Sequence, residues 1–252
     1  MRYPKDSTVM THSDIVLLKH VRNARFVGHQ QLFELLCHDS EMFSRSSFNW
    51  RVQRLIQSNQ IECVPGRWWD SSSVYNISRN GLLELESRGE FLIALNSSTR
   101  KISNPLHVFH ALELNAIRLA LANHGLLAGW QSDIEIASRN MVNGQFSKDY
   151  DALVKIWHRG EPIEFALEYE RSLKSAKEYD KICCALENER EIRCILYLAA
   201  HPDLLSALLQ RLTPTSHKIG LTTSVLFREE MLSATVTIAG ENRLMTLAEF
   251  LL

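Results

Sequence analysis

Hydrophobic residues in the first quarter of the chain recur every three or four positions, which is the spacing of amphipathic helices. The pattern predicts three short helices in quick succession, over residues 11–24, 28–36 and 44–59. In the first of them, polar capping residues precede an apolar stripe that includes Ile15 and Leu18. We therefore expect a small helical core near the start of the sequence.

From residue 60 onward the pattern changes to short runs of β-forming residues. Residues 60–78 hold two such runs around a loop that contains proline and glycine, and residues 79–95 have the pattern of a further helix. Three helices followed by a β-hairpin is the layout of a winged helix-turn-helix. In that module the third helix enters the major groove of DNA, and the hairpin touches the backbone nearby.

The predicted third helix carries side chains suited to that role. It contains no Asp or Glu between Ser44 and Ser58, and Arg and Asn are the residues that make bidentate contacts with guanine and adenine edges. The same layout also serves protein contact and dimerisation, so a protein-binding helix remains open as an alternative. The candidate DNA-binding residues are Arg45, Ser47, Asn49, Arg51 and Arg54 on this helix and Arg67 in the hairpin loop.

The second half of the chain alternates between helical and extended patterns. Residues 96–106 are polar, contain a proline and lack periodicity, which predicts a linker between a domain over residues 1–95 and another over residues 107–252. The order αβββαβα, with further strands at the end, predicts a mixed sheet flanked by helices, and hence an α/β protein of two domains. Helices are predicted over 106–125, 172–188 and 202–212, and strands over 128–138, 150–158, 163–170, 192–200, 218–227 and 234–240.

Three carboxylates stand at the ends of two neighbouring predicted strands. Asp151 opens one strand, and Glu168 and Glu170 close its hairpin partner. Because side chains alternate along a strand, Glu168 and Glu170 should share one side of the sheet, with Asp151 beside Glu168. Carboxylates held rigidly in this way are suited to Mg²⁺ or Mn²⁺ and to phosphodiester chemistry. An ordinary amphipathic strand, with acids on its exposed side and apolar residues on the other, explains the pattern equally well.

The second half resembles the PD-(D/E)xK nuclease superfamily, whose core is also αβββαβ. The stretch "YDA" at 150–152 stands in place of the family's Pro-Asp element, and "EYE" at 168–170 in place of its (D/E)xK element. The family lysine is Glu170 here, and Lys174 or Lys177 on the following helix could replace it. The resemblance implies Asp151, Glu168, Glu170 and Lys174 as catalytic residues, and Asp151, Glu168 and Glu113 as metal ligands.

Taken whole, the chain resembles the replication-relaxation family of bacterial mobile-element proteins, which pair a winged helix with a nuclease-like half. The likeness spans most of the chain up to about residue 200 and is carried by "SDIVLLKHVRNARFVGHQQLFELL", "RVQRLIQSNQIE", "VYNISRNGLLEL", "HALELN" and "YDALVKI…ALEYERS". It implies binding of double-stranded DNA in a plasmid, phage or integrated element. The implied role is a regulator or accessory factor with a degenerate nuclease domain. The alternatives are a metal-dependent deoxyribonuclease targeted by its winged helix and a protein-binding adaptor.

Composition narrows these expectations only a little. The formal net charge is -1, so any DNA-binding surface must be a local patch. The five cysteines show no zinc-ligand spacing, which favours reduced thiols in the cytoplasm. No signal peptide or long apolar run is present, so we expect no membrane partner. Because winged helices often bind inverted repeats, a homodimer is expected, and mobile-element proteins are possible further partners.

Overall fold

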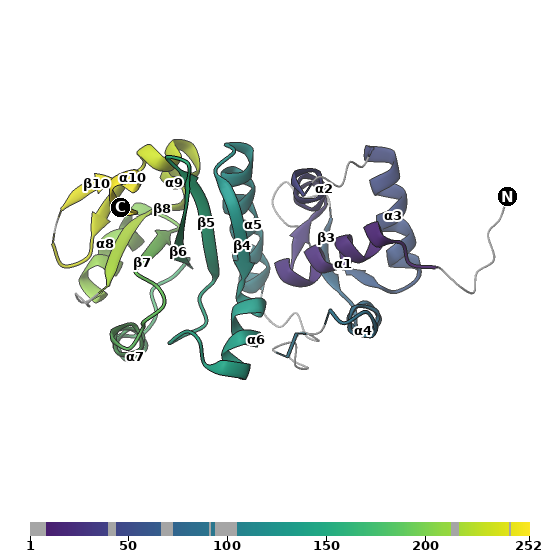
Figure 1. Cartoon of the computed structure of the whole chain (residues 1–252), viewed down its shortest axis with the longest axis horizontal. Coiled ribbons are helices and arrows are strands. Elements are labelled where there is room, and N and C mark those ends of the chain that lie inside the picture. Colours follow the sequence, from purple (N-terminus) through teal and green to yellow (C-terminus); the bar gives the residue numbers. More distant parts are fainter. Residues whose placement is uncertain are drawn as a thin grey trace. The chain divides into compact units, whose positions relative to one another are not determined.

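The computed structural model describes residues 9–39, 44–66, 73–90, 92–93, 105–212, 217–241 and 243–252. These residues form two compact units (Figure 1). The N-terminal unit contains the described residues up to 90 together with residues 105–119, and the C-terminal unit contains residues 92–93 and those from 120 onward. The predicted linker falls outside the described residues, except that Pro105 and Leu106 open a helix.

The N-terminal unit combines helices with a small antiparallel sheet. The sheet has three strands in the order β1-β3-β2, with both pairings antiparallel. The two-residue β1 lies between the first two helices and was not predicted, and α4 ends at Ser87 instead of running to residue 95. The elements of this unit are α1 (His12–Ala24), β1 (Val27–Gly28), α2 (His29–His38), α3 (Arg45–Gln57), β2 (Ile61–Cys63), β3 (Val74–Ile77), α4 (Arg79–Ser87) and the first part of α5 (Pro105–Asn123).

Side-chain caps fix where the helices of this unit begin. Thr11 and Asp14 form a capping box at the start of α1, and Ser44 and Ser78 accept hydrogen bonds from backbone N–H groups at the starts of α3 and α4. The apolar stripes then meet in one core, as the periodicity predicted. Its fully buried members include Leu17, Leu18, Val21, Leu32, Leu36, Phe48, Val52 and Leu55.

One glycine is required by a close approach of two backbone segments. A Cβ atom built at Gly81, in the first turn of α4, would lie 2.2 Å from the carbonyl oxygen of Gln60. Ser78, which caps the same helix, donates its hydroxyl to the carbonyl oxygen of Asn59 at 2.6 Å and its N–H to that of Gln60 at 3.1 Å. These contacts join the start of α4 to the turn that follows α3.

Most of helix α5 belongs to the N-terminal unit, although the sequence predicted that it would belong to the second domain. Asn115 donates from Nδ2 to the carbonyl oxygen of Phe26 at 2.8 Å, and Gln31 donates from Nε2 to that of Leu112 at 2.8 Å. Leu119 is buried in the core of the N-terminal unit. Polar and apolar contacts together therefore tie this helix to α2 and to the segment around β1.

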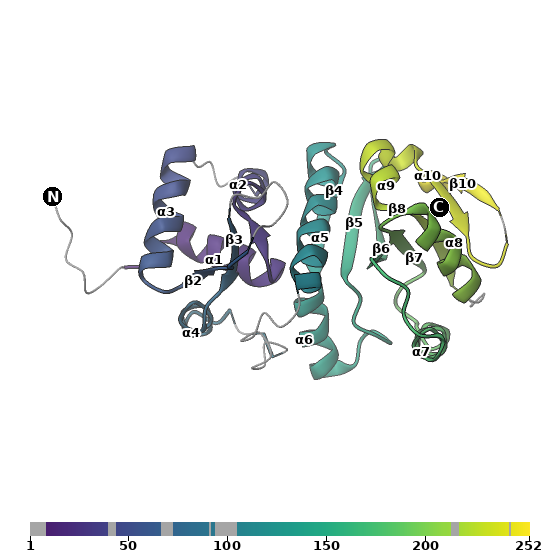
Figure 2. The same ribbon diagram turned by 180° about the vertical axis from the view of Figure 1, so that it is seen from behind.

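The C-terminal unit is built on a seven-stranded mixed sheet in the order β10-β9-β8-β7-β6-β5-β4 (Figure 1; Figure 2). Pairing is parallel between β6 and β7 and between β7 and β8, and antiparallel between the other neighbours. The chain is thus a mixed α/β protein, as predicted. The elements are β4 (Leu127–Ser132), α6 (Asp133–Asn143), β5 (Ala152–His158), β6 (Glu161–Glu170), α7 (Ala176–Glu187), β7 (Cys194–Ala199), α8 (Pro202–Arg211), β8 (Lys218–Thr223), α9 (Ser224–Glu230), β9 (Thr235–Ile238), β10 (Leu244–Thr246) and α10 (Leu247–Phe250).

A two-residue turn joins β5 to β6. Arg159 and Gly160 have φ angles of 52° and 86°, which is the pattern of the hairpin turns that match the twist of antiparallel strands. The turn sets the register in which Ala152 lies opposite Leu167. It thereby brings the start of β5 next to the end of β6, where the three carboxylates were predicted to meet.

Both faces of the sheet are covered. On the face that carries Ala166 and Ile195, the core includes Tyr179 and Leu186 of α7 and residues of α6 and α8. On the opposite face, a Cβ atom at Gly220 would meet the ring of Phe250 from α10 at 2.8 Å. Residues 165–170 of β6 are all buried, so the alternative that placed Glu168 and Glu170 on the exposed side of an amphipathic strand was wrong.

Two predicted strands in this unit end earlier than expected, and two further elements were not predicted. The strand expected over 128–138 ends at Ser132, and a helix follows, because Ser132 and Glu135 form a capping box. The strand expected over 218–227 turns into α9 at Ser224, capped by Thr223. Strand β10 and helix α10 were not predicted.

Candidate functional site

Helix α3 presents a polar stripe to solvent. The residues at 46, 49, 50, 53 and 57 are all exposed, and their spacing of three and four positions places them on one side of the helix. The opposite side is fixed in the core by Phe48, Val52 and Leu55. We call this surface the α3 stripe, and its members are Ser46, Asn49, Trp50, Gln53 and Gln57.

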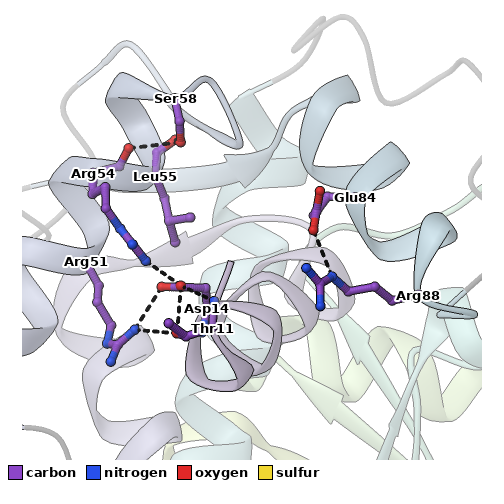
Figure 3. A network of polar contacts seen from close by, with 8 residues as sticks. All are labelled: Thr11, Asp14, Arg51, Arg54, Leu55, Ser58, Glu84 and Arg88. Carbon is purple, nitrogen blue, oxygen red and sulfur yellow. Dashed lines mark hydrogen bonds and ion pairs between the residues drawn. The ribbon is translucent and has the colours of Figure 1, made fainter. Parts of the chain in front are cut away.

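Two of the predicted DNA-contacting arginines lie instead against α1, where both pair with Asp14 (Figure 3). Arg51 donates from Nη1 to Asp14 Oδ1 at 2.9 Å and to Thr11 Oγ1 at 2.9 Å, and Arg54 forms an ion pair with Asp14 Oδ2. The Asp14 carboxylate is fully buried, and each arginine side chain is only 18% exposed.

The protonation of Asp14 reflects these partners. Burial alone raises the pKa of Asp14, but hydrogen bonds from Arg54 and Thr11 outweigh burial, and the net result is a lowered pKa. The carboxylate is therefore ionised at neutral pH and acts as an internal counter-ion for α3. This pairing could not be predicted from the sequence, because Asp14 occupies the position of an ordinary helix cap.

The other predicted residues of the N-terminal unit have varied surroundings. Arg45 is exposed, and its guanidinium lies 4.6 Å from the centre of the Phe33 ring. Ser47 is half-buried and donates its backbone N–H to the capping hydroxyl of Ser44. Asn49 is exposed on the α3 stripe, and Arg67 lies outside the described residues.

In the C-terminal unit the three carboxylates do meet on one side of the sheet. Glu168 and Glu170 are each 5% exposed and lie on the face covered by α7. Asp151 precedes β5 and accepts a hydrogen bond through Oδ2 from the backbone N–H of Tyr169 at 2.8 Å. The predicted grouping of Asp151, Glu168 and Glu170 is thus present at the carboxyl end of β6.

Two lysines neutralise the glutamates of this group. Lys148 donates from Nζ to Glu168 Oε1 at 2.5 Å, and Lys174 pairs with Glu170 Oε1. Lys174 was predicted as the replacement for the missing family lysine. Lys148, which is 16% exposed and lies three positions before Asp151, was missed. We call these five residues the carboxylate–lysine cluster.

Burial decides the ionisation of the cluster. It raises the pKa of Glu168 to about 7, with Asp151 adding to the rise and Lys148 opposing it. Burial also raises the pKa of Glu170, which Lys174 partly offsets. Burial would lower the pKa of Lys174, but the attraction of Glu170 outweighs it and the pKa is raised.

A tyrosine hydroxyl without a partner lies beside the cluster. Tyr197 of β7 stands next to Glu168 in the parallel register, is fully buried, and its Oη makes no hydrogen bond. Burial, followed by the charges of Glu168 and Glu170, raises the pKa of this phenol well above its usual range. A buried hydroxyl left unpaired destabilises a fold by about 1–3 kcal/mol.

The lysines of the cluster compete with any divalent cation for the glutamate oxygens. Glu168 and Glu170 direct carboxylate oxygens at lysines, and within the described part of the chain no three His, Cys, Asp or Glu side chains are placed to hold a metal ion. A cation bound to both glutamates would therefore have to share their carboxylates with Lys148 and Lys174 or displace these lysines. The predicted third ligand, Glu113, lies on α5 among the residues of the N-terminal unit.

Within the described ranges, every helix is too short or too polar to cross a membrane bilayer. Comparison of the chain with protein-family models, with curated proteins and with solved structures finds no match.

Proposed function

We propose that this chain is a sequence-directed DNA-binding protein, whose N-terminal unit acts as a winged helix-turn-helix and inserts α3 into the major groove. The observation that carries the proposal is the α3 stripe: an exposed row of amide, hydroxyl and indole side chains without a carboxylate. The stripe projects from a helix held rigidly by its own core. The order of elements, three helices followed by the hairpin of β2 and β3, supports the proposal, because it matches the layout of this module.

The setting of this role follows from the resemblance to the replication-relaxation family. It supports a regulator or accessory factor of a plasmid, phage or integrated element, acting as a homodimer on an inverted repeat. The C-terminal unit would then serve assembly or partner binding. The pairing of Glu168 and Glu170 with lysines supports this assignment, because an ammonium group occupies one oxygen of each carboxylate.

Selection from random-sequence duplexes tests the proposed function. The full-length chain is incubated with a library of such duplexes, and the bound fraction is recovered and sequenced over successive rounds. We expect one motif to be enriched. A double variant, Asn49→Ala with Gln53→Ala, should bind the enriched duplex at least about 10-fold more weakly, since each good base contact contributes about 1–3 kcal/mol.

The matched control is Asn80→Ala, because Asn80 is an exposed asparagine on α4, away from the α3 stripe. Its binding should equal that of the unaltered chain. If no motif rises above its frequency in the input library, the proposed function is wrong. If the control loses as much affinity as the double variant, the stripe is not the contact surface.

A second candidate function is metal-dependent cleavage of DNA. The meeting of Asp151, Glu168 and Glu170 on one side of the sheet favours it, together with the resemblance to PD-(D/E)xK nucleases. Supercoiled plasmid incubated with the protein in Mg²⁺ and separately in Mn²⁺ is the test. Nicking that disappears in Asp151→Ala would establish cleavage, and intact plasmid under both metals, with DNA still bound, would leave the regulator role.

A further inference from the structure

A chain of hydrogen bonds inside the N-terminal unit ends on the α3 stripe. Tyr75 of β3 bonds through its hydroxyl to His29 Nδ1 at 2.9 Å, and His29 Nε2 bonds to Asn49 Oδ1 at 3.1 Å. The three residues come from three different elements, β3, α2 and α3. Among the described hydrogen bonds, these connect one member of the α3 stripe, Asn49, to the sheet.

The direction of each bond in the relay follows from donor and acceptor chemistry. An amide oxygen only accepts, so His29 must donate from Nε2 to Asn49. Neutral His29 then accepts at Nδ1, and the hydroxyl of Tyr75 is the donor. Burial lowers the pKa of His29, and Arg45 lowers it further, which keeps the ring neutral at pH 7 although Asn49 opposes the shift.

Packing holds the relay in place. The His29 ring lies 4.9 Å from the ring of Phe48, centre to centre, and 5.8 Å from that of Tyr75. Tyr75 is 3% exposed and Phe48 is fully buried. Two aromatic neighbours therefore hold the imidazole of His29 in place. The imidazole in turn holds the amide oxygen of Asn49, whose side chain is otherwise exposed.

Asn49 retains the groups needed to recognise adenine. Its oxygen keeps a second lone pair and its amide nitrogen keeps two N–H donors, while a bidentate contact with adenine uses one acceptor and one donor. The neighbouring side chains of the α3 stripe also suit A·T base pairs. Gln53 also carries an amide, and Trp50, 57% exposed, offers an apolar surface for a thymine methyl group.

The α3 stripe lacks the residue types that usually recognise guanine. Bidentate contacts with guanine come chiefly from arginine or lysine, and the α3 stripe contains neither. The arginines nearest along the helix, Arg51 and Arg54, are paired with Asp14. Arg45 lies at the start of α3, beside the ring of Phe33.

We infer that Asn49 reads an adenine in the target site, that His29 and Tyr75 are positioning residues which hold its amide for that contact, and that the target is centred on A·T base pairs. The inference rests on the proposed function, since it names the base class that the α3 stripe recognises. A relay of this kind lowers the entropy cost of the contact, because the amide is oriented before DNA arrives.

The experiment uses the full-length chain and the duplex enriched from the random library, together with copies in which each A·T pair is changed to G·C in turn. Fluorescence anisotropy gives the affinity for every copy. We expect Asn49→Ala to remove the preference for A·T at one position, with a loss of about 5- to 150-fold on the unchanged duplex. On the copy altered at that position, Asn49→Ala and the unaltered chain should bind alike.

His29→Phe and Tyr75→Phe separate positioning from folding, since both keep an aromatic ring in the core and remove only the polar link. Each should flatten the preference at the same position as Asn49→Ala, with a smaller loss, while its thermal midpoint stays near that of the unaltered chain. A loss spread evenly over all copies would overturn the positioning role. An enriched motif rich in G·C at the contacted positions would overturn the inference while leaving DNA binding intact, and no enrichment at all would overturn both.

Discussion

The double variant Arg51→Ala with Arg54→Ala should strongly destabilise the N-terminal unit, whatever its effect on DNA binding. In the structure both guanidinium groups pair with Asp14, whose carboxylate is fully buried (Figure 3). Among the described residues, removing both leaves the buried Asp14 carboxyl group with Thr11 as its remaining side-chain partner, through the Thr11 N–H at 2.8 Å and hydroxyl at 2.7 Å. A buried charge stripped of its partners is among the costliest single lesions in a protein.

The expected loss of unfolding free energy is about 3–5 kcal/mol, which is the range for removing one partner of a buried ion pair. The side chains of Arg51 and Arg54 are only 18% exposed, so solvent screening reduces this figure little. The contact of Arg54 with the Trp50 ring, at 4.8 Å, adds about 0.5–1 kcal/mol. A typical domain has about 5–15 kcal/mol in total, so the unit would be left close to unfolding.

Hydrogen exchange followed by mass spectrometry measures this locally, on peptides that cover α1 and α3. An opening free energy lower by about 3–5 kcal/mol speeds exchange by about 150- to 4,000-fold. Arg88→Ala is the matched control, because Arg88 pairs with Glu84 at 2.8 Å on the exposed surface of α4, as Figure 3 also shows. Such a pair contributes about 0.3–0.5 kcal/mol. Exchange in the double variant no faster than in Arg88→Ala would refute the account of Asp14.

Three further outcomes follow from contacts described above. Because burial raises the pKa of Glu168 to about 7 from 4.5, the native state binds an extra proton between those values, so the stability of the C-terminal unit should fall as pH rises from about 4.5 to 7. Urea denaturation at several pH values checks this, and Lys148→Met, which removes the opposing charge, should extend the fall to higher pH. Tyr197→Phe should raise unfolding free energy by about 1 kcal/mol, since it deletes a buried hydroxyl that has no partner; a lower urea midpoint would contradict that reasoning. Gly81→Ala should cost about 1–3 kcal/mol by forcing a methyl group against the oxygen of Gln60, and an unchanged thermal midpoint would show that the two backbone segments separate without cost.

Local signals in the sequence located most helices and strands. Polar caps before apolar stripes placed α1 and α3 within a residue or two of their true ends, and strand alternation placed Glu168 and Glu170 on one face. The same logic would have found α6, because Ser132 and Glu135 have the spacing of a capping box. Such features depend on residues close together in the chain, which is why they can be inferred without a structure.

The partners of the charged side chains could not be inferred in that way. Arg51 and Arg54 meet Asp14 only because α1 and α3 cross in the core, and residue type on α3 alone suggested a DNA contact instead. The orphan hydroxyl of Tyr197 and the pairing of Lys148 with Glu168 likewise depend on which strands become neighbours. The two-sided burial of residues 165–170 in β6 was missed because it depends on elements that pack on both faces of the sheet, which local sequence does not reveal.

The change from antiparallel to parallel pairing at β6 bears on the order in which the C-terminal unit assembles. The β5–β6 hairpin closes over the two-residue turn at Arg159 and Gly160, whereas β7 can join only after the chain has crossed back through α7. Short loops close at a lower entropy cost than long ones, so the hairpin is expected to form first. Lys148 and Lys174, the partners of Glu168 and Glu170, lie twenty and four residues away in the chain, so both are close to the glutamates once the hairpin has formed. Charge neutralisation would thus precede burial, and the strand would enter the core carrying its own counter-ions.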